Sequence, residues 1–292
     1  MGILKAHTGN GKVHLGEIDP GFHDGLDRAS CAAATAVLHA ELTEIQELMY
    51  AAGLTGMLIV LQGLDSAGKD GTIAHVMSAV NPQGCRVAGF KVPTPEEASH
   101  DFLWRVHPHA PPRGVIAIFN RSHYEDVLAV RVHNLVPTEV WRARYAQINH
   151  FENLLVDSQT VILKFFLHIS KEEQKERLLE REKTTETAWK LSAGDWHERT
   201  FWSDYHRAYE EAIETCSTPH APWFIVPADH KWFRNYVITE AIVEALRPYR
   251  PSWEKHLKQV GVAAREELQK MRLAGGADAD GIAPDSGKRK TE

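Results

Sequence analysis

The residues best suited to chemistry lie in one glycine-rich segment, which runs from Gly63 to Thr72 and has the spacing Gly-x4-Gly-Lys. Glycines let the backbone curl so that successive amide N–H groups face one anion, and a following helix N-terminus adds positive potential. Lys69 would then reach a phosphoryl group in transfer. The segment lies between an apolar run and a helical pattern, as this motif requires. The residues predicted to bind phosphate are Gly63, Ser66, Ala67, Gly68, Lys69, Asp70 and Gly71. The alternative is a glycine-rich turn that binds no ligand.

Two carboxylates distinguish this segment from most phosphate-binding loops. The residue after the lysine is usually Ser or Thr, whose hydroxyl binds Mg²⁺, but this chain has Asp70 there and a second acid, Asp65, inside the loop. These acids would repel a phosphate unless a cation lay between them. We therefore expect a metal-dependent site in which carboxylates replace this hydroxyl as ligands of Mg²⁺, or of Mn²⁺ in its place.

A second polar segment, Asn120–Asp126, follows another strand candidate. Ligands of open α/β sheets bind beyond the carboxyl ends of the strands, and an acid at such a position commonly helps to hold Mg²⁺. Arg121 has the planar fork that suits phosphate oxygens, and Glu125 and Asp126 are candidate metal ligands. The alternative is a structural role, in which Ser122 is the N-cap of a helix and Glu125 is its capping-box partner.

A parallel sheet would bring these segments together, and the chain has the pattern for one. Five short apolar runs are strand candidates, at residues 57–61, 85–90, 115–119, 161–169 and 223–226. Helical patterns lie at 30–52, 70–79, 98–106, 123–133, 138–156 and 231–246. Strands that alternate with helices indicate an α/β fold, with a five-stranded parallel sheet, helices on both faces and right-handed crossovers.

Composition divides the chain into three parts. Residues 1–28 have no hydrophobic period and are expected to form an extended arm. The domain that carries the motifs would span residues 29–254, with a charged helical insertion at about 171–215 that adds no strand. Residues 255–292 would form a charged helix to about Leu273 and then a disordered tail, because the last residues lack an apolar face.

The overall composition excludes several classes of protein. The 292 residues include 33 Lys+Arg and 39 Asp+Glu, a net charge of −6, so broad nucleic-acid binding is not expected. No run of about 18 apolar residues predicts a membrane span, and the first residues lack a secretory apolar region. We therefore expect a cytoplasmic protein without a membrane partner. Three cysteines without a CxxC pair argue against a disulfide framework or a zinc site.

The motifs together resemble the polyphosphate kinase 2 family. The resemblance rests on Gly-Leu-Asp-Ser-Ala-Gly-Lys-Asp-Gly at 63–71, Asn-Arg-Ser-His-Tyr-Glu-Asp at 120–126, Trp-Lys-Leu-Ser at 189–192, Ala-Pro-Trp-Phe at 221–224 and Asp-His-Lys at 229–231. It extends over about residues 26–254. It implies a P-loop kinase fold similar to thymidylate kinase, with the insertion as a helical lid over the phosphates. It also implies Mg²⁺, inorganic polyphosphate, AMP, ADP and ATP as ligands, and assembly into a homo-oligomer.

The resemblance implies roles for individual residues as well. Asp65 and Lys69 would act at the metal and at the transferred phosphoryl group. The residues that would clamp the polyphosphate chain are Arg121, Arg177 and Arg181. Lys91 would contact polyphosphate, and the motif residues Lys190 and Lys231 would bind phosphate or nucleotide. For Arg177 and Arg181 the alternative is an ordinary salt-bridged helix surface, because several glutamates surround them.

One departure from the family pattern concerns the acceptor. Other branches resemble Asp-Arg-Ser-Trp-Tyr-Asn at the second motif, with the carboxylate first and the amide last. In this chain the two groups are exchanged, because the amide is at Asn120 and the carboxylate is at Glu125. This form resembles the branch that phosphorylates both AMP and ADP, and it makes Glu125 the better candidate for the metal. We therefore expect transfer of the terminal phosphoryl group of polyphosphate to AMP and ADP, with ATP extending polyphosphate in reverse. The alternatives are an ATP-dependent nucleoside monophosphate kinase of the thymidylate kinase type and a non-catalytic nucleotide-binding module.

An aromatic stripe at helical spacing lies inside the charged insertion. Its members are Trp196, Phe201, Trp202, Tyr205 and Tyr209. We interpret the stripe as core packing rather than as a platform for a base, since aromatic residues at this spacing form the buried face of a helix.

Overall fold

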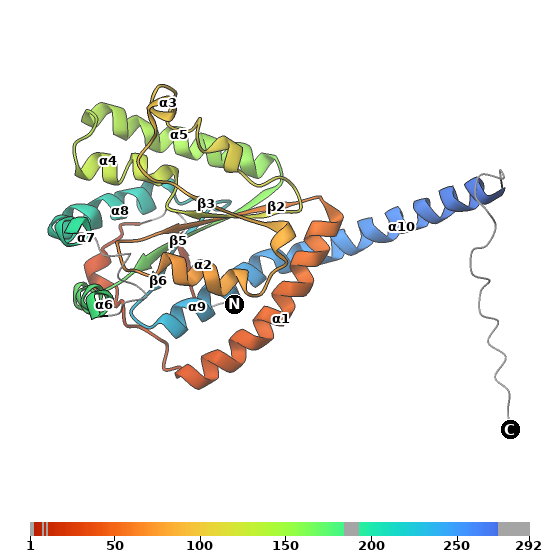
Figure 1. Cartoon of the computed structure of the whole chain (residues 1–292), viewed down its shortest axis with the longest axis horizontal. Helices are drawn as coiled ribbons and strands as arrows, with labels where there is room; N and C mark the ends of the chain where they lie inside the picture. The colour runs from red at the N-terminus through yellow and green to blue at the C-terminus, as the bar shows by residue number, and fades with distance from the viewer. Residues whose placement is uncertain (1–2, 8, 10, 184–192, 274–292) are drawn as a thin grey trace.

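The computed structural model describes residues 3–7, 9, 11–183 and 193–273, and its centre is one sheet in the order β1-β6-β5-β2-β4-β3 (Figure 1). The strands are β1 (Ala6–His7), β2 (Gly56–Gln62), β3 (Cys85–Gly89), β4 (Ile116–Asn120), β5 (Thr160–His168) and β6 (Trp223–Pro227). The five predicted parallel strands are confirmed, and each end lies within one residue of its expected place. The number of strands was wrong, because β1 of the N-terminal arm pairs antiparallel with β6. With only two residues, β1 is too short to show the alternation of apolar and polar residues by which a strand is predicted from sequence.

Helices cover both faces of the sheet, so its central strands are buried on both sides (Figure 1). One layer contains α1 (Arg28–Ala52), α2 (Lys69–Met77) and α9 (Lys231–Leu246), and the other contains α4 (Ala129–Val132), α5 (Thr138–Asp157) and α8 (Trp202–Cys216). Every residue of β2 is buried, which explains why this strand reads as a continuous apolar run rather than as an alternating one.

The longest helix of the first layer, α1, has clear signals at both ends. The Asp27 side chain caps it by accepting from the Ser30 N–H, and the Ser30 side chain completes a capping box. Gly53 ends it in the left-handed region, with φ +60°, where glycine meets no steric penalty. The prediction of a helix at 30–52 is confirmed.

Two other predicted helices were wrong in extent. The region 98–106 contains only the last residue of a short helix, α3 (Pro95–Ala98), and Asp101 then forms a turn by accepting from the Leu103 N–H. The region 123–133 is divided into a 3₁₀ turn, His123–Asp126, and α4. Arg144 donates to the carbonyl of Asp126, which removes that carbonyl from a continuous helical ladder.

The insertion between β5 and β6 forms α6 (Lys171–Lys183), α7 (Ala193–Glu198) and α8. The described residues of this insertion contribute no strand to the sheet, as predicted. Residues 184–192, which include Lys190, lie outside the described residues. Residues 12–17 of the N-terminal arm run along α8, where the backbone N–H groups of Val13 and Leu15 donate to Glu214 and Glu210.

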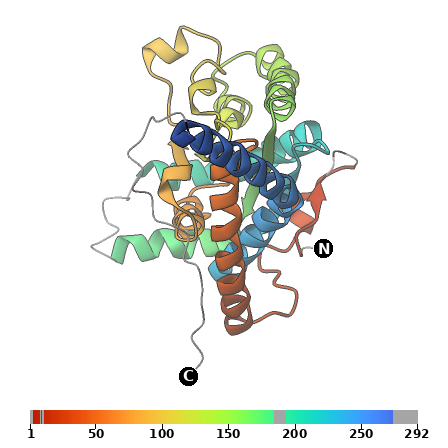
Figure 2. The ribbon, with the colours of Figure 1, turned by 90° about the vertical axis from the view of Figure 1, so that its right-hand side faces the viewer.

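The last described helix, α10 (Arg250–Leu273), begins against α1 and then leaves the body of the molecule (Figures 1 and 2). Trp253 buries its indole completely at the start of α10, whereas Val260, Leu268 and Met271 are about half exposed farther along. The predicted disordered tail, 274–292, lies outside the described residues. Among the described helices none combines the length and apolar composition of a membrane span.

Candidate active site

The glycine-rich segment curls between the end of β2 and the start of α2, as its sequence predicts. Gly63 and Gly68 have φ values of +154° and +106°, in the range that favours glycine, and Ser66 lies at φ +65°. A Cβ atom on Gly68 would lie 1.9 Å from Nη1 of Arg234, so a larger residue would displace that guanidinium as well as strain the backbone. The buried hydroxyl of Ser66 has no hydrogen-bond partner among the described residues. The loop therefore leaves amide and hydroxyl donors near the N-terminus of α2, which suits an anion.

Lys69 is the first residue of α2, and its ammonium group lies inside the loop. Its Nζ atom donates to the carbonyls of Gly63 and Leu64 over 2.7 and 3.3 Å, and the side chain is buried. Burial, together with the charge of Arg121, lowers the pKa of Lys69 to about 8. The group is mostly cationic at neutral pH, at the centre of the loop where a phosphoryl group would lie.

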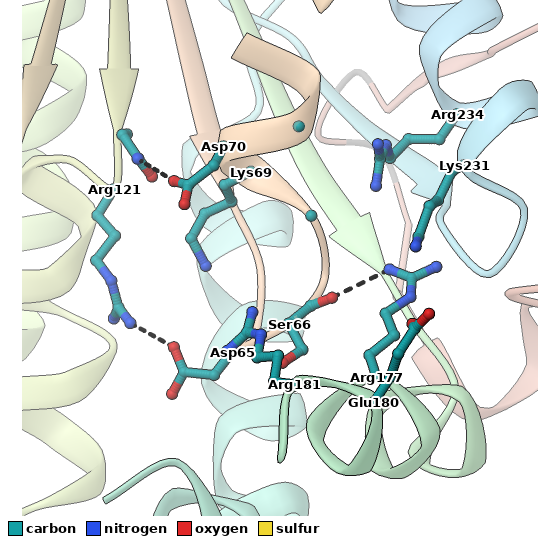
Figure 3. Close-up of a pocket in the computed structure, with 13 residues that line it drawn as sticks. Asp65, Ser66, Lys69, Asp70, Arg121, Arg177, Glu180, Arg181, Lys231 and Arg234 are labelled. Carbon is teal, nitrogen blue, oxygen red and sulfur yellow. Dashed lines mark hydrogen bonds and ion pairs between the residues drawn. The ribbon is translucent and has the colours of Figure 1, made fainter. Parts of the chain in front are cut away.

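Arg121 joins the two predicted motifs (Figure 3). Its guanidinium donates to Asp65 over 2.6 Å and to Glu125 over 3.4 Å. Burial alone would lower the pKa of Arg121, but the two carboxylates raise it above its ordinary value. Asn120, the last residue of β4, donates from Nδ2 to Asp70 over 2.9 Å. In the exchanged pair, the amide of Asn120 therefore contacts Asp70, and the carboxylate of Glu125 faces Arg121.

Glu125 is not a capping-box partner of Ser122. Ser122 does cap the 3₁₀ turn, but its hydroxyl accepts from the N–H of Tyr124. When the Gln62 amide is oriented to satisfy both of its ends, it donates to Oε1 of Glu125 over 3.0 Å and accepts from Ser122. The capping-box alternative was therefore wrong, and the Glu125 carboxylate points toward the site.

The two lid arginines have different surroundings. All five N–H groups of Arg177 donate within the protein: to Glu173 and to the carbonyls of Ser66, Ala67, Ala228 and Asp229, over 2.7–3.1 Å. Arg177 is buried, and these contacts make it the link between α6, the glycine-rich loop and the end of β6 rather than a free clamp for a chain of phosphates. Arg181 is partly exposed, and within the described part of the chain it makes one ion pair, to Asp195 over 3.1 Å.

Helix α9 supplies two cations, of which sequence reasoning found only one. Lys231 begins the helix and lines the same cavity as Arg181. Arg234, one turn later, is almost fully buried and donates to the carbonyl of Ala67 over 3.1 Å and to Asn235. Burial and the nearby charge of Arg177 lower the pKa of Arg234 to about 10. Arg234 follows Lys231 by three residues, so both lie on one helix face. This spacing is the feature of the sequence that could have identified Arg234 as a site residue.

Two other predicted residues are not brought to this site. Lys91 is exposed and lines neither cavity described below; its carbonyl accepts from Arg105 over 2.7 Å. Asp126 turns away from the loop and pairs with Arg144 over 3.0 Å and with Arg105. Burial outweighs these cations and raises the pKa of Asp126 to about 6. Its predicted role as a metal ligand is therefore corrected to that of a buried ion-pair partner. Lys190 lies outside the described residues.

Two cavities meet at Asp65 and Arg121. The first has a volume of about 600 Å³ and is shown in Figure 3. It is lined by Asp65, Ser66, Gly68, Lys69, Asp70, Gly71, Asn120, Arg121, Arg177, Glu180, Arg181, Lys231 and Arg234. The second has a volume of about 170 Å³ and is lined by Gly63, Leu64, Asp65, Arg121, Glu125, His133, Gln174, Glu198, Arg199, Trp202, Tyr205 and Tyr209. We call them the cationic cavity and the aromatic cavity.

The aromatic stripe of the insertion has both a packing and a surface role. Tyr205 and Tyr209 are buried, as predicted for core packing. With Trp202 they also form one wall of the aromatic cavity, which the periodicity of one helix could not show. Trp196 donates to Glu182 over 3.2 Å and does not line that wall.

The carboxylate oxygens around Arg121 are suitable ligands for a hard divalent cation that takes most of its ligands from phosphates. Asp65 and Glu125 present oxygen ligands on the two sides of one guanidinium. Among the described residues no group of three or more His, Cys, Asp or Glu side chains could form a complete cage. Mg²⁺ typically binds one or two carboxylates and takes its other ligands from water and substrate phosphates. The acids of this site therefore fit Mg²⁺ better than a metal that needs an all-protein site.

Comparison with known proteins agrees with this geometry. The family model described as "Polyphosphate kinase 2 (PPK2)" matches residues 25–252. The chain is 50% identical over 239 residues to the AMP/ADP-polyphosphate phosphotransferase of Meiothermus ruber, covering 81% of this chain and 90% of that protein. It is 40% identical over 277 residues to the ADP-polyphosphate phosphotransferase of Rhodopseudomonas palustris, covering 89% and 93%. The crystal structure of polyphosphate kinase 2 from Arthrobacter aurescens TC1 has a TM-score of 0.79 and 39% identity, and the match covers 85% of this chain and 92% of that one.

The matched residues include the glycine-rich loop, the turn at 120–126 and all three lid helices. A glycine-rich loop at a helix N-terminus, a link through Arg121 between two acidic motifs and a cationic cavity beside them are features of a phosphoryl-transfer site. On the sequence match, the structural match and this site, the chain belongs to the polyphosphate kinase 2 family.

Proposed function

We propose that this protein transfers the terminal phosphoryl group of inorganic polyphosphate to AMP and to ADP, and that ATP extends polyphosphate by the reverse reaction at the same site. The observation that carries the proposal is the meeting of the two cavities at Asp65 and Arg121. The names of the Meiothermus ruber and Rhodopseudomonas palustris relatives support it, because both are polyphosphate phosphotransferases and the first acts on AMP and ADP.

The cationic cavity is the proposed site of polyphosphate. Lys69, Arg181, Lys231 and Arg234 line it, and its volume of about 600 Å³ exceeds that of a single phosphate. Cations of this kind offset the charge of a polyanion locally, against the net charge of −6 of the whole chain. The terminal phosphoryl group of the donor would lie at the glycine-rich loop beside Lys69.

The aromatic cavity is the proposed site of the acceptor nucleotide. It lies on the other side of Asp65 and Arg121, and Trp202 and Tyr205 form part of its wall. Aromatic rings offer a face on which a base can stack, and Arg121 can receive the acceptor phosphate. The acceptor oxygen would thus approach the donor from the side opposite the leaving chain, as in-line transfer requires.

Charge neutralisation and positioning are the proposed sources of catalysis. Lys69 and Arg121 would stabilise negative charge on the transferred group, and donors that are fixed before reaction lose little energy in reorganising. We propose that Asp65 and Glu125 hold Mg²⁺, or Mn²⁺ in its place, with substrate phosphates as further ligands. When bound, this ion would neutralise charge between donor and acceptor.

Two further features belong to the proposal. The exposed apolar residues of α10, Val260, Leu268 and Met271, support association of copies into a homo-oligomer. Light scattering of the intact chain would test this, because a monomer at micromolar concentration contradicts it. We also propose that the protein acts in the cytoplasm, where AMP and ADP are available as acceptors.

The activity is tested by supplying polyphosphate and Mg²⁺ with AMP or ADP as separate acceptors, in the absence of ATP. We expect ADP and then ATP to form from AMP, and ATP to form from ADP. A protein that phosphorylates AMP with ATP but not with polyphosphate would be a nucleoside monophosphate kinase, and a protein that does neither would be a binding module.

A further inference from the structure

A buried charged network lies directly behind the turn that carries Arg121 and Glu125. Lys164 of β5 is fully buried, and the three residues on each side of it in the strand are apolar. It forms an ion pair with Glu152 of α5, which is also buried, and it donates to the hydroxyl of Tyr124 over 2.9 Å and to the carbonyl of Cys216 over 2.7 Å. All three protons of its ammonium group are therefore engaged.

Glu152 connects the same lysine to the turn at 120–126. Its Oε1 atom accepts from the hydroxyl of Tyr124 over 2.8 Å and lies 3.2 Å from Nε2 of His123. Burial alone would raise the pKa of Glu152, but Lys164 and His123 bring it below its ordinary value, so the group is a carboxylate. Burial lowers the pKa of His123, and a neutral His123 donates to that carboxylate through Nε2.

The network holds the side of the turn that faces away from the substrate cavities. His123 and Tyr124 are fully buried and point to Glu152, whereas Arg121 and Glu125 line the aromatic cavity. Arg121 has a left-handed backbone, with φ +61°, which is unfavourable for an arginine and persists only where neighbouring contacts fix it. The Arg121 N–H is fixed before the turn, where it donates to the carbonyl of Leu61 over 3.1 Å, and the contacts of His123 and Tyr124 fix the backbone after it.

We propose that Lys164 and Glu152, acting through His123 and Tyr124, are positioning residues that set Arg121 and Glu125 for reaction. The inference rests on the proposed function for the reaction that is measured. A buried ion pair adds little to stability compared with an apolar pair of the same size, so stability alone does not account for a lysine inside a central strand. The contact to Cys216 extends the network to the end of α8, which forms the aromatic wall of the same cavity.

The mildest test is Tyr124→Phe, which removes one hydroxyl and leaves the Lys164–Glu152 pair intact. We expect kcat to fall at least about fivefold with ADP as acceptor, because the hydroxyl donates to Glu152 and accepts from Lys164, and one ordinary hydrogen bond corresponds to about fivefold. The KM for polyphosphate should change less than kcat, because Arg121 lines the cationic cavity but Glu125 lines only the aromatic one. The matched control is Tyr145→Phe, which removes a buried hydroxyl that contacts Arg131, 3.3 Å away, and no member of the network. It should keep the kinetics of the wild type.

A second set of variants separates positioning from a general loss of stability. In a Glu125→Gln background, Tyr124→Phe should lower kcat by less than twofold, because Glu125, one of the two groups that it positions and a partner of Arg121, has already lost its charge. The double variant Lys164→Met with Glu152→Gln avoids an unpaired buried charge and should repeat the fall in kcat, with a smaller change in the KM for polyphosphate. Melting curves establish that each variant is folded at the assay temperature.

The proposal is overturned if folded Tyr124→Phe has the kcat of the wild type, or if its effect is the same in both backgrounds. The second result would mean that Tyr124 supports the fold independently of Glu125. If the wild type uses ATP and not polyphosphate as donor, the proposed function fails, but the same comparison with ATP as donor still tests the positioning network.

Discussion

Replacing Arg177 with Ala should destabilise the protein, whereas replacing Arg181 with Ala should weaken polyphosphate binding and leave stability unchanged. The structure separates the two residues, although they lie one turn apart on α6. Arg177 is buried and donates to four carbonyls and to Glu173. Arg181 is partly exposed and forms an ion pair with Asp195.

The magnitudes follow from these contacts. Removal of Arg177 leaves several buried carbonyls without this donor, and each unsatisfied group costs about 1–3 kcal/mol. The carbonyl of Ala67 keeps Arg234 as a donor, and water will reach part of the space. We therefore expect a net loss of about 3 kcal/mol, which corresponds to a fall in Tm of about 6–12 °C. The ion pair of Arg181 is worth about 0–1 kcal/mol, but one charge-assisted contact to phosphate is worth about 1.5–3 kcal/mol, or roughly tenfold to a hundredfold in KM.

Thermal melts and initial rates with varied polyphosphate measure both effects. Arg177→Lys should recover only part of the stability, because one ammonium group cannot reproduce the planar fork, whereas Arg181→Lys should recover much of the affinity. The reasoning is refuted if Arg177→Ala melts with the wild type and shows only a raised KM for polyphosphate. Arg177 would then be a clamp, as the family resemblance implied.

The remaining predictions concern the loop, the exchanged pair, pH and metal. Lys69→Ala should lower kcat by about 10²–10³ with little change in Tm, since it removes charge stabilisation in transfer; a rate above a tenth of the wild type contradicts this. Glu125→Gln should lower kcat about a hundredfold with AMP and less with ADP, because AMP brings only one phosphate to the site, and Asn120→Ala should cost less in the same assay. Because the pKa of Lys69 is lowered to about 8, polyphosphate affinity should fall as pH rises from 7 to 9, and a flat KM profile over that range argues against its role. Excess chelator should stop turnover and added Mg²⁺ should restore it, since the acids of the loop otherwise repel both substrates; full activity in chelator contradicts a metal-dependent site.

The sequence predicts the sheet and the phosphate loop well because their signals are local. Each parallel strand is a short apolar run, and the ends of those runs fix where Gly63 and Asn120 leave the sheet. Gly68 is required by its own backbone angle and by the approach of Arg234. A motif with these properties keeps its structure in many surroundings, so its spacing alone identifies it.

The errors arise where long-range contacts decide the structure. Asp126 follows Glu125 directly in sequence, but Arg105 and Arg144 draw it to the opposite side of the turn. Arg177 and Arg181 share a helix face, yet only the folded chain shows that the first is enclosed by carbonyls. Arg234 is distant from both motifs in sequence and reaches the loop through the packing of α9.

The direct test of the central claim is to follow the phosphoryl group itself. Wild-type protein is mixed with polyphosphate, ADP and Mg²⁺, without ATP, and ³¹P NMR records both substrates, with Lys69→Ala as the control. We expect loss of polyphosphate residues to match the appearance of the γ-phosphate of ATP one for one, with no transfer by the control. Release of orthophosphate without ATP, or transfer that begins only when ATP is supplied as donor, would contradict the account.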